Sequence, residues 1–259
     1  MNSLIKMSYK IDVFSTAHSI QEEDVRGKVI VVIDVLRASS TIVAALVNGA
    51  KGVIPVEDME AASKIALNLD SSRYLLCGEK DGKKIDGYHL GNSPLEYTRD
   101  VIEEKTLIFN TTNGTKAITR ANLAEKIIIG SFLNLKTIVK ELKDVENEII
   151  LLCAGWKNRL SLEDNLCAGN IIYDLMEGTL PEDASDGAKV AFVLYEKFKD
   201  NINNTIKTSN HAKRLKNLVN TDDVNYCSQL SIFDTLPELN EGIITDARNG
   251  SKKQNPKSK

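Results

Sequence analysis

The sequence is poor in the features that mark disulfide frameworks, zinc sites and membrane proteins. It has only four cysteines in 259 residues, and none shows the Cys-x-x-Cys spacing of a zinc or redox motif. All four lie in or beside apolar segments, which predicts buried free thiols in a reducing cytoplasm. No apolar run approaches the length of a membrane span, and no signal-peptide core is present. We therefore expect a cytoplasmic protein with no membrane partner.

The motifs of several common enzyme classes are also absent. The chain contains no Walker A sequence, no Gly-x-Gly-x-x-Gly, no His-Glu-x-x-His and no Gly-x-Ser-x-Gly. A haloacid-dehalogenase phosphatase would need an acid two residues after Asp34, where this chain has Leu36. The net charge of −3 and the isoelectric point near 5.8 argue against nucleic acid as the main partner.

What remains is the pattern of a soluble α/β protein. Apolar runs of strand length alternate with helical patterns between residues 8 and 248, with no linker or internal repeat, so we expect one domain. The predicted fold is a three-layer α/β/α arrangement around a mostly parallel sheet, followed by a disordered basic tail at 249–259. The expected strands are 10–14, 29–33, 52–56, 74–77, 106–110, 126–129, 148–153 and 243–245. The expected helical segments are 42–49, 58–69, a short one after 115, 133–142, 163–176 and 182–220.

The stretch 28–41 organises the chain. Val29–Ile33 is an unbroken β-branched run, which predicts a strand buried on both faces. Asp34 follows it, then Arg37 and the hydroxyl cluster Ser39-Ser40-Thr41, just before a helix. An acid, a base and hydroxyls at a helix N-terminus could hold a metal-bound anion. The structural alternative is a capped helix with a solvated Asp–Arg pair.

Polar residues also follow the ends of other predicted strands. Glu79, the turn 111–115, Ser131 and the loop 155–164 all occupy such positions. Ligands of open α/β sheets bind at the edge formed by the carboxyl ends of the strands, so these residues predict an active site there. Each also has a structural alternative: Glu79 as a solvated acid, the turn and Asp164 as helix caps. His211 is either a helix-surface residue or a brace over the crevice.

Several carboxylates near one another favour Mg²⁺ over a softer metal. Arg37 and Arg159 can act as forks for an anion, and hydroxyl groups can donate to its oxygens. Together these groups suit a phosphoryl group, whose transfer depends on positioning and on charge neutralisation. Cys153 and Cys167 are assigned to packing and not to nucleophilic catalysis.

Five segments resemble the motif set of the 2-phosphosulfolactate phosphatase (ComB) family, in the same order along residues 28–230. They are Ile33-Asp-Val-Leu-Arg-Ala-Ser-Ser-Thr41, Gly91-Asn-Ser-Pro-Leu-Glu96, Thr111-Thr-Asn-Gly-Thr115, Gly130-Ser-Phe-Leu-Asn134 and Ser161-Leu-Glu-Asp-Asn-Leu-Cys-Ala-Gly169. One departure is Asn158-Arg159-Leu160, where we expect a Gly-Arg-Phe-like segment. It retains Arg159 but changes the loop around it.

The resemblance implies a Mg²⁺-dependent phosphatase that converts (2R)-2-phospho-3-sulfolactate, a small anionic phosphorylated sulfonate, to 3-sulfolactate and phosphate, on a route to coenzyme M. It implies the family's own α/β/α fold and leaves a homodimer open. Asp34 and Arg37 would be catalytic, and Asp34, Glu79 and either Glu163 or Asp164 would hold the metal. Binding of the metal by Asp34 competes with a role as nucleophile. The expected substrate-binding residues are Ser39, Ser40, Thr41, Asn92, Ser93, Thr111, Thr112, Asn113, Gly114, Thr115 and Arg159.

Two rival functions use the same donors. One is a non-catalytic sensor of Mg²⁺-bound phosphometabolites, and the other is a phosphatase for a different phosphorylated hydroxy acid. Phosphate release with and without Mg²⁺ separates a sensor from an enzyme.

Overall fold

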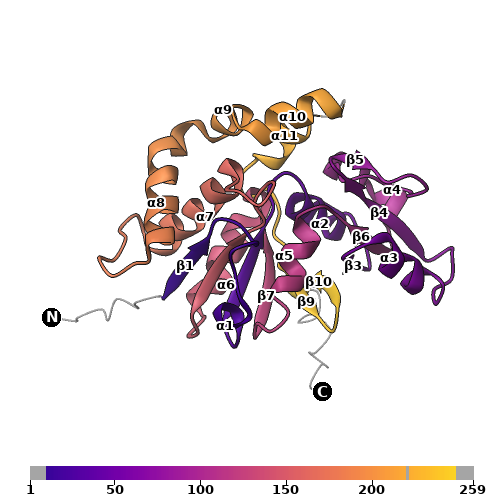
Figure 1. The fold of residues 1–259 in the computed structure, drawn as a ribbon, viewed down its shortest axis with the longest axis horizontal. Coiled ribbons are helices and arrows are strands. Elements are labelled where there is room, and N and C mark those ends of the chain that lie inside the picture. Colours follow the sequence, from indigo (N-terminus) through magenta and orange to yellow (C-terminus); the bar gives the residue numbers. More distant parts are fainter. Residues whose placement is uncertain (1–9, 220–221, 249–259) are drawn as a thin grey trace, which may run out of the picture.

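A computed structural model describes residues 10–219 and 222–248, and the predicted tail at 249–259 lies outside them. Within these residues the strands form one ten-stranded sheet in the order β1-β8-β2-β7-β9-β10-β3-β6-β4-β5 (Figure 1). The sheet is mostly parallel and helices pack on it, so the predicted α/β class is confirmed. The strands are β1 (Ile11–Phe14), β2 (Val29–Ile33), β3 (Gly52–Val56), β4 (Tyr74–Lys80), β5 (Lys83–Lys84), β6 (Thr106–Asn110), β7 (Lys126–Gly130), β8 (Ile149–Cys153), β9 (Pro237–Asn240) and β10 (Ile243–Asp246).

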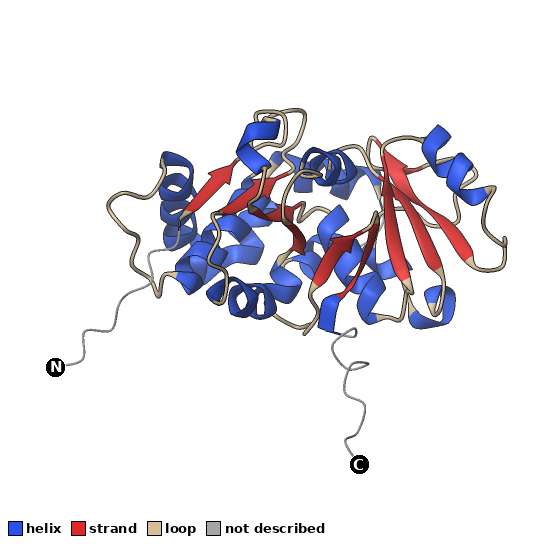
Figure 2. Cartoon of the chain, turned by 90° about the horizontal axis from the view of Figure 1, so that it is seen from below, coloured by secondary structure: helices blue, strands red, loops and turns tan. Residues whose placement is uncertain are grey.

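The sheet consists of two parallel blocks joined by the β9–β10 hairpin. Strands β1, β8, β2 and β7 form one block, and β3, β6 and β4 form the other. The hairpin pairs antiparallel with each block through one residue pair, Ile128 with Glu238 and Val53 with Ile244. The two blocks therefore run in opposite directions along the strand order, and they fan out on either side of the hairpin (Figure 2). The sequence predicted one strand here, at 243–245, and missed its partner β9.

The helices cover both faces of the first block. Alternate residues of β2 point to opposite faces, so Val31 and Ile33 join one core cluster and Ile30 and Val32 join another. The first cluster includes side chains of α6, α7 and α8, and the second includes side chains of α2 and α5. The longer helices are α2 (Ala38–Val47), α3 (Met59–Ala66), α5 (Gly114–Arg120), α6 (Leu135–Lys143), α7 (Leu162–Leu175), α8 (Asp186–Phe198), α9 (Ile202–Lys207) and α10 (Asn210–Leu218). The shorter ones are α1 (Glu22–Val25), α4 (Arg99–Ile102), α11 (Asp223–Cys227) and the 3₁₀ turns η1 (Pro94–Glu96), η2 (Phe132–Asn134) and η3 (Lys199–Asn201).

The region predicted as helical at 182–220 is a series of helices and not one rod. After α8 the chain turns through η3, and α9 and α10 then pass over the carboxyl end of the first block towards β5 (Figure 1). Ser209 separates α9 from α10 by capping the second of them, since its hydroxyl accepts the amide of Ala212 at 3.0 Å. This path carries α10 to the edge of the sheet where the site residues lie.

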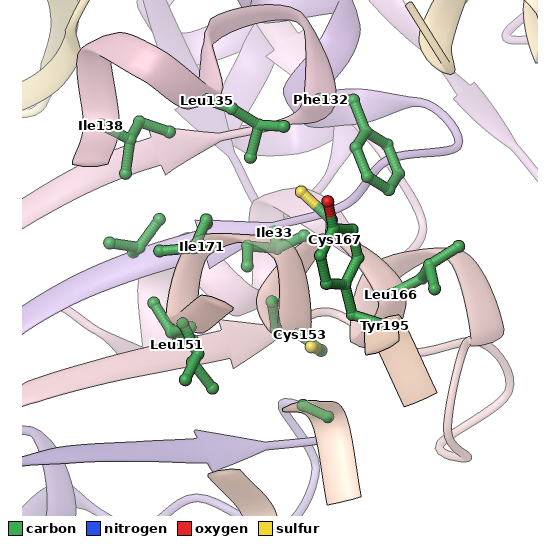
Figure 3. Packing of buried hydrophobic residues seen from close by; sticks show 14 of the residues in the cluster. Ile33, Phe132, Leu135, Ile138, Leu151, Cys153, Leu166, Cys167, Ile171 and Tyr195 are labelled. Carbon is green, nitrogen blue, oxygen red and sulfur yellow. The ribbon is translucent and has the colours of Figure 1, made fainter. Parts of the chain in front are cut away.

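The four cysteines are free and buried, as predicted. Cys153 at the end of β8 and Cys167 on α7 lie in the apolar cluster with Ile33, Leu151 and Phe132 (Figure 3). Burial raises the pKa of both thiols well above the usual value. Because a thiolate and not a thiol is the nucleophile, these positions favour packing over covalent catalysis.

No helix in the described part of the chain is both long enough and apolar enough to cross a bilayer.

Candidate active site

Asp34 directly follows β2, in the short segment that leads into α2. Its amide donates to the hydroxyl of Ser39 at 2.9 Å, and its carboxylate accepts from the amide of Ala38 at 3.3 Å. Burial raises the pKa of Asp34 to about 6; the charge of His211 opposes this rise, whereas that of Glu79 adds to it. A carboxylate whose ionised form is disfavoured by burial and by a neighbouring acid is a good candidate for a cation site.

Glu79, near the end of β4, is hydrogen-bonded to residues that follow β4 and β6. Its carboxylate accepts three hydrogen bonds: from the amide of Gly82 at 2.5 Å, and from the amide and hydroxyl of Thr112 at 2.7 Å and 3.1 Å. The side chain is only 7% exposed and lines the same pocket as Asp34. Glu79 is therefore not a solvated loop acid.

Gly78 and Gly114 allow these strand ends to come together. A Cβ at Gly78, whose φ is +141°, would lie 1.8 Å from the carbonyl oxygen of Asn110. A Cβ at Gly114 would lie 2.4 Å from Cβ of Ala38 and 2.8 Å from Oδ2 of Asp34. Gly114 thus belongs to the site through close packing of α5 on α2, and it offers no side-chain donor.

Arg37 is buried in a hydrogen-bonded network. Its Nη1 lies 2.6 Å from Oδ2 of Asp223, and its Nη2 donates to the carbonyl of Gly82 at 3.1 Å. The hydroxyl of Ser93 donates to the other oxygen of Asp223 at 2.5 Å. The solvated Asp34–Arg37 pair considered as an alternative is therefore wrong, because Arg37 pairs with Asp223 and is 4% exposed. The Leu36–Arg37 peptide bond is cis.

Asp223 is a residue that the sequence reasoning missed. It lies 186 positions from Arg37, in the short helix α11, and no local pattern pairs the two. Ser93 was expected to bind substrate. The structure instead directs its hydroxyl to Asp223, and the following turn η1 has no side-chain cap.

The hydroxyl cluster after Arg37 lies behind the pocket. Ser39, Ser40 and Thr41 are buried, and each hydroxyl donates to a main-chain carbonyl group. These bonds fasten the first turn of α2 to the ends of β2 and to the segment before η1. The helix accordingly begins at Ala38, four residues before the predicted start.

The turn 111–115 divides into two parts. Thr111 and Thr115 bond to each other, with the hydroxyl of each accepting the amide of the other. Thr112 and Asn113, in contrast, line the pocket. Of the five predicted residues, only these two border the pocket, and both donors of Thr112 are already directed to Glu79.

The Asp164 side chain accepts hydrogen bonds from main-chain amides in the segments that follow β2 and β8. Its carboxylate accepts from the amide of Val35 at 2.9 Å and from that of Gly155 at 3.2 Å. Burial raises its pKa well above the usual value, and the charges of Asp34 and Glu163 add to that effect. The side chain that caps α7 is that of Ser161, whose hydroxyl accepts the amide of Asp164 at 3.3 Å, and not that of Asp164. The Asp164 side chain positions loops and does not line the pocket.

Glu163 fixes the ring of His211 on α10. Oε1 of Glu163 lies 3.0 Å from Nδ1 of His211, and its fully buried Oε2 has no hydrogen-bond partner among the described residues. Burial raises the pKa of Glu163, but hydrogen bonding and the charge of His211 outweigh it and leave the pKa lowered. His211 lines the pocket and stacks on Trp156, so its predicted role as a brace over the crevice fits the structure.

One small cavity of about 70 Å³ collects these groups. Six of the predicted site residues line it: Asp34, Arg37, Glu79, Asn92, Thr112 and Asn113. Eight further residues line it that were not predicted as site residues: Leu36, Asp81, Gly82, Trp156, Lys157, His211, Arg214 and Leu215. Arg159, predicted to meet an anion, is exposed and does not line this pocket.

The carboxylates of the described residues do not form a complete metal site. Over residues 10–219 and 222–248, no group of three or more His, Cys, Asp or Glu side chains is arranged to hold a metal ion. The predicted ligand set with Glu163 or Asp164 is thus not assembled into a closed cage. Asp34 and Glu79 do share one pocket, and Mg²⁺ is commonly held by one or two carboxylates together with water and phosphate oxygens. Two oxygen ligands in one pocket are compatible in number and kind with such a site.

Comparison with known proteins gives the same assignment over nearly the whole chain. The family model described as 2-phosphosulpholactate phosphatase matches residues 14–242. A probable 2-phosphosulfolactate phosphatase of Clostridium perfringens (strain SM101) is 42% identical over 245 residues, covering 94% of this chain and 98% of that protein. Proteins with the same description from Clostridium novyi and Caldanaerobacter subterraneus are 41% and 37% identical, covering 91% and 90% of this chain and 99% and 97% of theirs.

The family match extends through β2, the turn 111–115 and α10, all of which contribute to the pocket. This chain belongs to the 2-phosphosulfolactate phosphatase family.

Proposed function

We propose that this chain is a Mg²⁺-dependent phosphatase that hydrolyses (2R)-2-phospho-3-sulfolactate to 3-sulfolactate and phosphate. The observation that carries the proposal is the pocket in which Asp34 and Glu79 lie beside Arg37, within a chain of this family. By the resemblance of its motifs, the reaction belongs to a route to coenzyme M.

Asp34 and Glu79 would hold the magnesium ion, which when bound neutralises charge on the phosphoryl oxygens. The residues of this chain then orient the substrate. Arg37 keeps free N–H groups after donating to Asp223 and Gly82, and these can donate to a phosphoryl oxygen. Thr112 and Asn113 border the same space from the β6 side. Since phosphoryl transfer depends mainly on positioning and charge, this arrangement suffices to favour the reaction.

Phosphate release from (2R)-2-phospho-3-sulfolactate tests the proposal. The purified protein should release phosphate with Mg²⁺, lose activity after treatment with a chelator and regain it when Mg²⁺ is returned. Zn²⁺ should restore it poorly, because oxygen-only ligands suit the harder ion.

Three other outcomes would change the assignment. Activity unaffected by chelation removes the metal from the proposal. Binding without turnover under any divalent ion makes the protein a sensor. Faster turnover of another phosphorylated hydroxy acid would change the assigned substrate but leave the assigned reaction, phosphate-ester hydrolysis, in place.

A further inference from the structure

The charged groups of the pocket lie at two depths. Asp34 and Glu79 lie deep beside Arg37, at 7%, 7% and 4% exposure, whereas Lys157 and Arg214 lie at the rim, exposed and half-buried respectively, together with the exposed acid Asp81. The acids disfavour an anion unless a cation binds with it. The rim cations can bind an anion directly. A substrate with two acidic groups of different kinds therefore has two different places to put them.

Lys157 and Arg214 both lie against the ring of Trp156, the only tryptophan in the chain. Nζ of Lys157 lies 4.9 Å from the centre of its ring, and Cζ of Arg214 lies 5.9 Å from it. His211 stacks on the same ring, with the centroids 5.5 Å apart and the planes at 10°. Glu163, which is buried, contacts Nδ1 of His211. The stacked rings of Trp156 and His211 are therefore attached to the buried part of the protein.

Both cations are placed by defined backbone contacts. Arg214 donates from Nη2 to the carbonyl of Asp81 at 2.7 Å, which leaves its other N–H groups available. Trp156 and Arg159 exchange two main-chain hydrogen bonds, of 2.9 Å and 3.0 Å, around Lys157 and Asn158. These two residues have φ values of +54° and +57°, as in a type I′ hairpin turn. The turn puts Lys157, and not Arg159, on the wall of the pocket.

We propose that Arg214 and Lys157 bind the sulfonate of the substrate and set the preference for a sulfonated phosphoester. The inference rests on the proposed function. In 2-phospho-3-sulfolactate the carboxylate and the carbon that bears the sulfonate both flank the carbon of the phosphoester, so with the phosphoryl group near Asp34 and Glu79 the sulfonate, on the longer arm, reaches further outward. A sulfonate is a weak base with three oxygens, and it suits a guanidinium fork and an ammonium group better than a carboxylate-lined floor.

The test compares two substrates in Arg214→Met and Lys157→Met. The second substrate is 2-phospholactate, which retains the phosphoester and the carboxylate but has no sulfonate. Charged hydrogen bonds of this kind correspond to roughly 10–100-fold in affinity. Each variant should therefore raise KM for 2-phospho-3-sulfolactate by about that factor with kcat little changed, and leave KM for 2-phospholactate nearly as it was. Arg214→Lys should recover part of the loss.

Lys216→Met is the matched control, because Lys216 is an exposed cation on the same helix that lines a different cavity. It should change neither KM. Equal losses on both substrates in Arg214→Met would make Arg214 a general positioning residue and overturn the inference, as would unchanged KM values in both Met variants.

A binding measurement separates this inference from the proposed function. If the wild-type protein hydrolyses neither substrate, the proposed function fails. Calorimetric binding of 3-sulfolactate against lactate, in wild type and in Arg214→Met, still decides the role of the rim. Preference for 3-sulfolactate that is lost in Arg214→Met supports it, and equal binding of the two acids overturns it.

Discussion

At the scale of single residues, the site keeps charged groups in surroundings that disfavour them. Asp34 and Asp164 have raised pKa values because they are buried among other carboxylates, and Arg37 is buried against Asp223. Such positions cost folding stability and are retained where function needs them. Removing one of these charges should therefore separate stability from activity.

Asp34→Asn should raise the stability of the metal-free protein at neutral pH and abolish its activity. The pKa of Asp34 is about 6 in the folded protein and 3.8 in the unfolded chain. The neutral carboxyl group of Asp34 contributes favourably to the free energy of unfolding; this contribution is fully present below pH 4 and is lost as the pH rises through 6. Above that pH the ionised carboxylate costs at most about 3 kcal/mol, at about 1.4 kcal/mol per pKa unit.

Thermal unfolding at several pH values checks this prediction. The gain in Tm of the variant over wild type should be present at pH 7.5 and small at pH 4. Mg²⁺ should raise the Tm of wild type more than that of the variant, because a ligand stabilises only a state that binds it. A gain that does not depend on pH would show that the Asp34 charge is not its source.

Arg37→Lys should lower kcat by about 10²–10³ and raise KM much less, because an ammonium group cannot reproduce a planar fork beside the phosphoryl group. Some stability should also be lost, since the single nitrogen of a lysine cannot occupy the positions of both Nη1, which donates to Asp223, and Nη2, which donates to Gly82. Steady-state kinetics on a variant with a wild-type circular dichroism spectrum gives the answer. A normal kcat would reduce Arg37 to a structural partner of Asp223.

At the scale of secondary-structure elements, the site depends on how closely helices approach. Strand β2 was predicted with its observed bounds, since a β-branched run buried on both faces is unmistakable. Helix α2 was predicted to start too late, because Ser39, Ser40 and Thr41 suggest a capping region. Their hydroxyls instead bond to carbonyl groups that are distant in sequence or precede the helix. Tertiary contacts of this kind override local preference.

Gly114→Ala should disrupt the seam between α5 and α2. The added methyl group would lie 2.4 Å from Ala38 and 2.8 Å from the carboxylate of Asp34, so one helix must move. Overpacking of this kind costs about 1–3 kcal/mol. We also expect at least a tenfold loss of kcat, because Asp34 is displaced. Urea unfolding and kinetics measure the two effects, and Thr119→Ala on the same helix is the control. An active, fully stable Gly114→Ala protein would contradict the packing described.

Other parts of the site could not be deduced from the sequence. The Asp81-Gly82 pair between β4 and β5 is a recognisable hairpin turn, but the two lysines of β5 resemble a solvated loop. Asp223 and His211 reach the pocket only through the path of the helices after α8, and Lys157 only through the turn after β8. These are long-range pairings, for which local propensity and periodicity contain no information.

At the scale of the whole molecule, the order of strands was also beyond prediction. β9 is short, begins with a proline and carries Glu238, so it resembles a loop. It nevertheless lies in the interior of the sheet, where it pairs with β7 and β10. The single domain proposed for residues 8–248 stays a prediction, and the continuous ten-stranded sheet is compatible with it.

Truncation after Leu236 should abolish cooperative folding. The change removes β9 and β10, and with them the strand pairing between the two parallel blocks. It also exposes β7 and β3 as unprotected edges, which favour aggregation. Heat-induced unfolding and gel filtration should show a broad or absent transition and soluble aggregates. A sharp, wild-type-like transition would mean that the blocks hold together without the hairpin.

The position of the β9–β10 hairpin also constrains folding during synthesis. At about 5–20 residues per second, the ribosome needs on the order of 10–50 s to make the 240 or so residues that reach β10. Both parallel blocks are complete once β8 ends at Cys153, and β9 begins only at Pro237, so for about 4–17 s of that interval the blocks have been made but the strands that join them have not. The nascent protein is thus a pair of half-sheets with two open edges, and its exposure to aggregation and to chaperones is fixed by translation speed. Synonymous codons that slow the last forty positions should therefore lower the yield of soluble protein without altering a single residue.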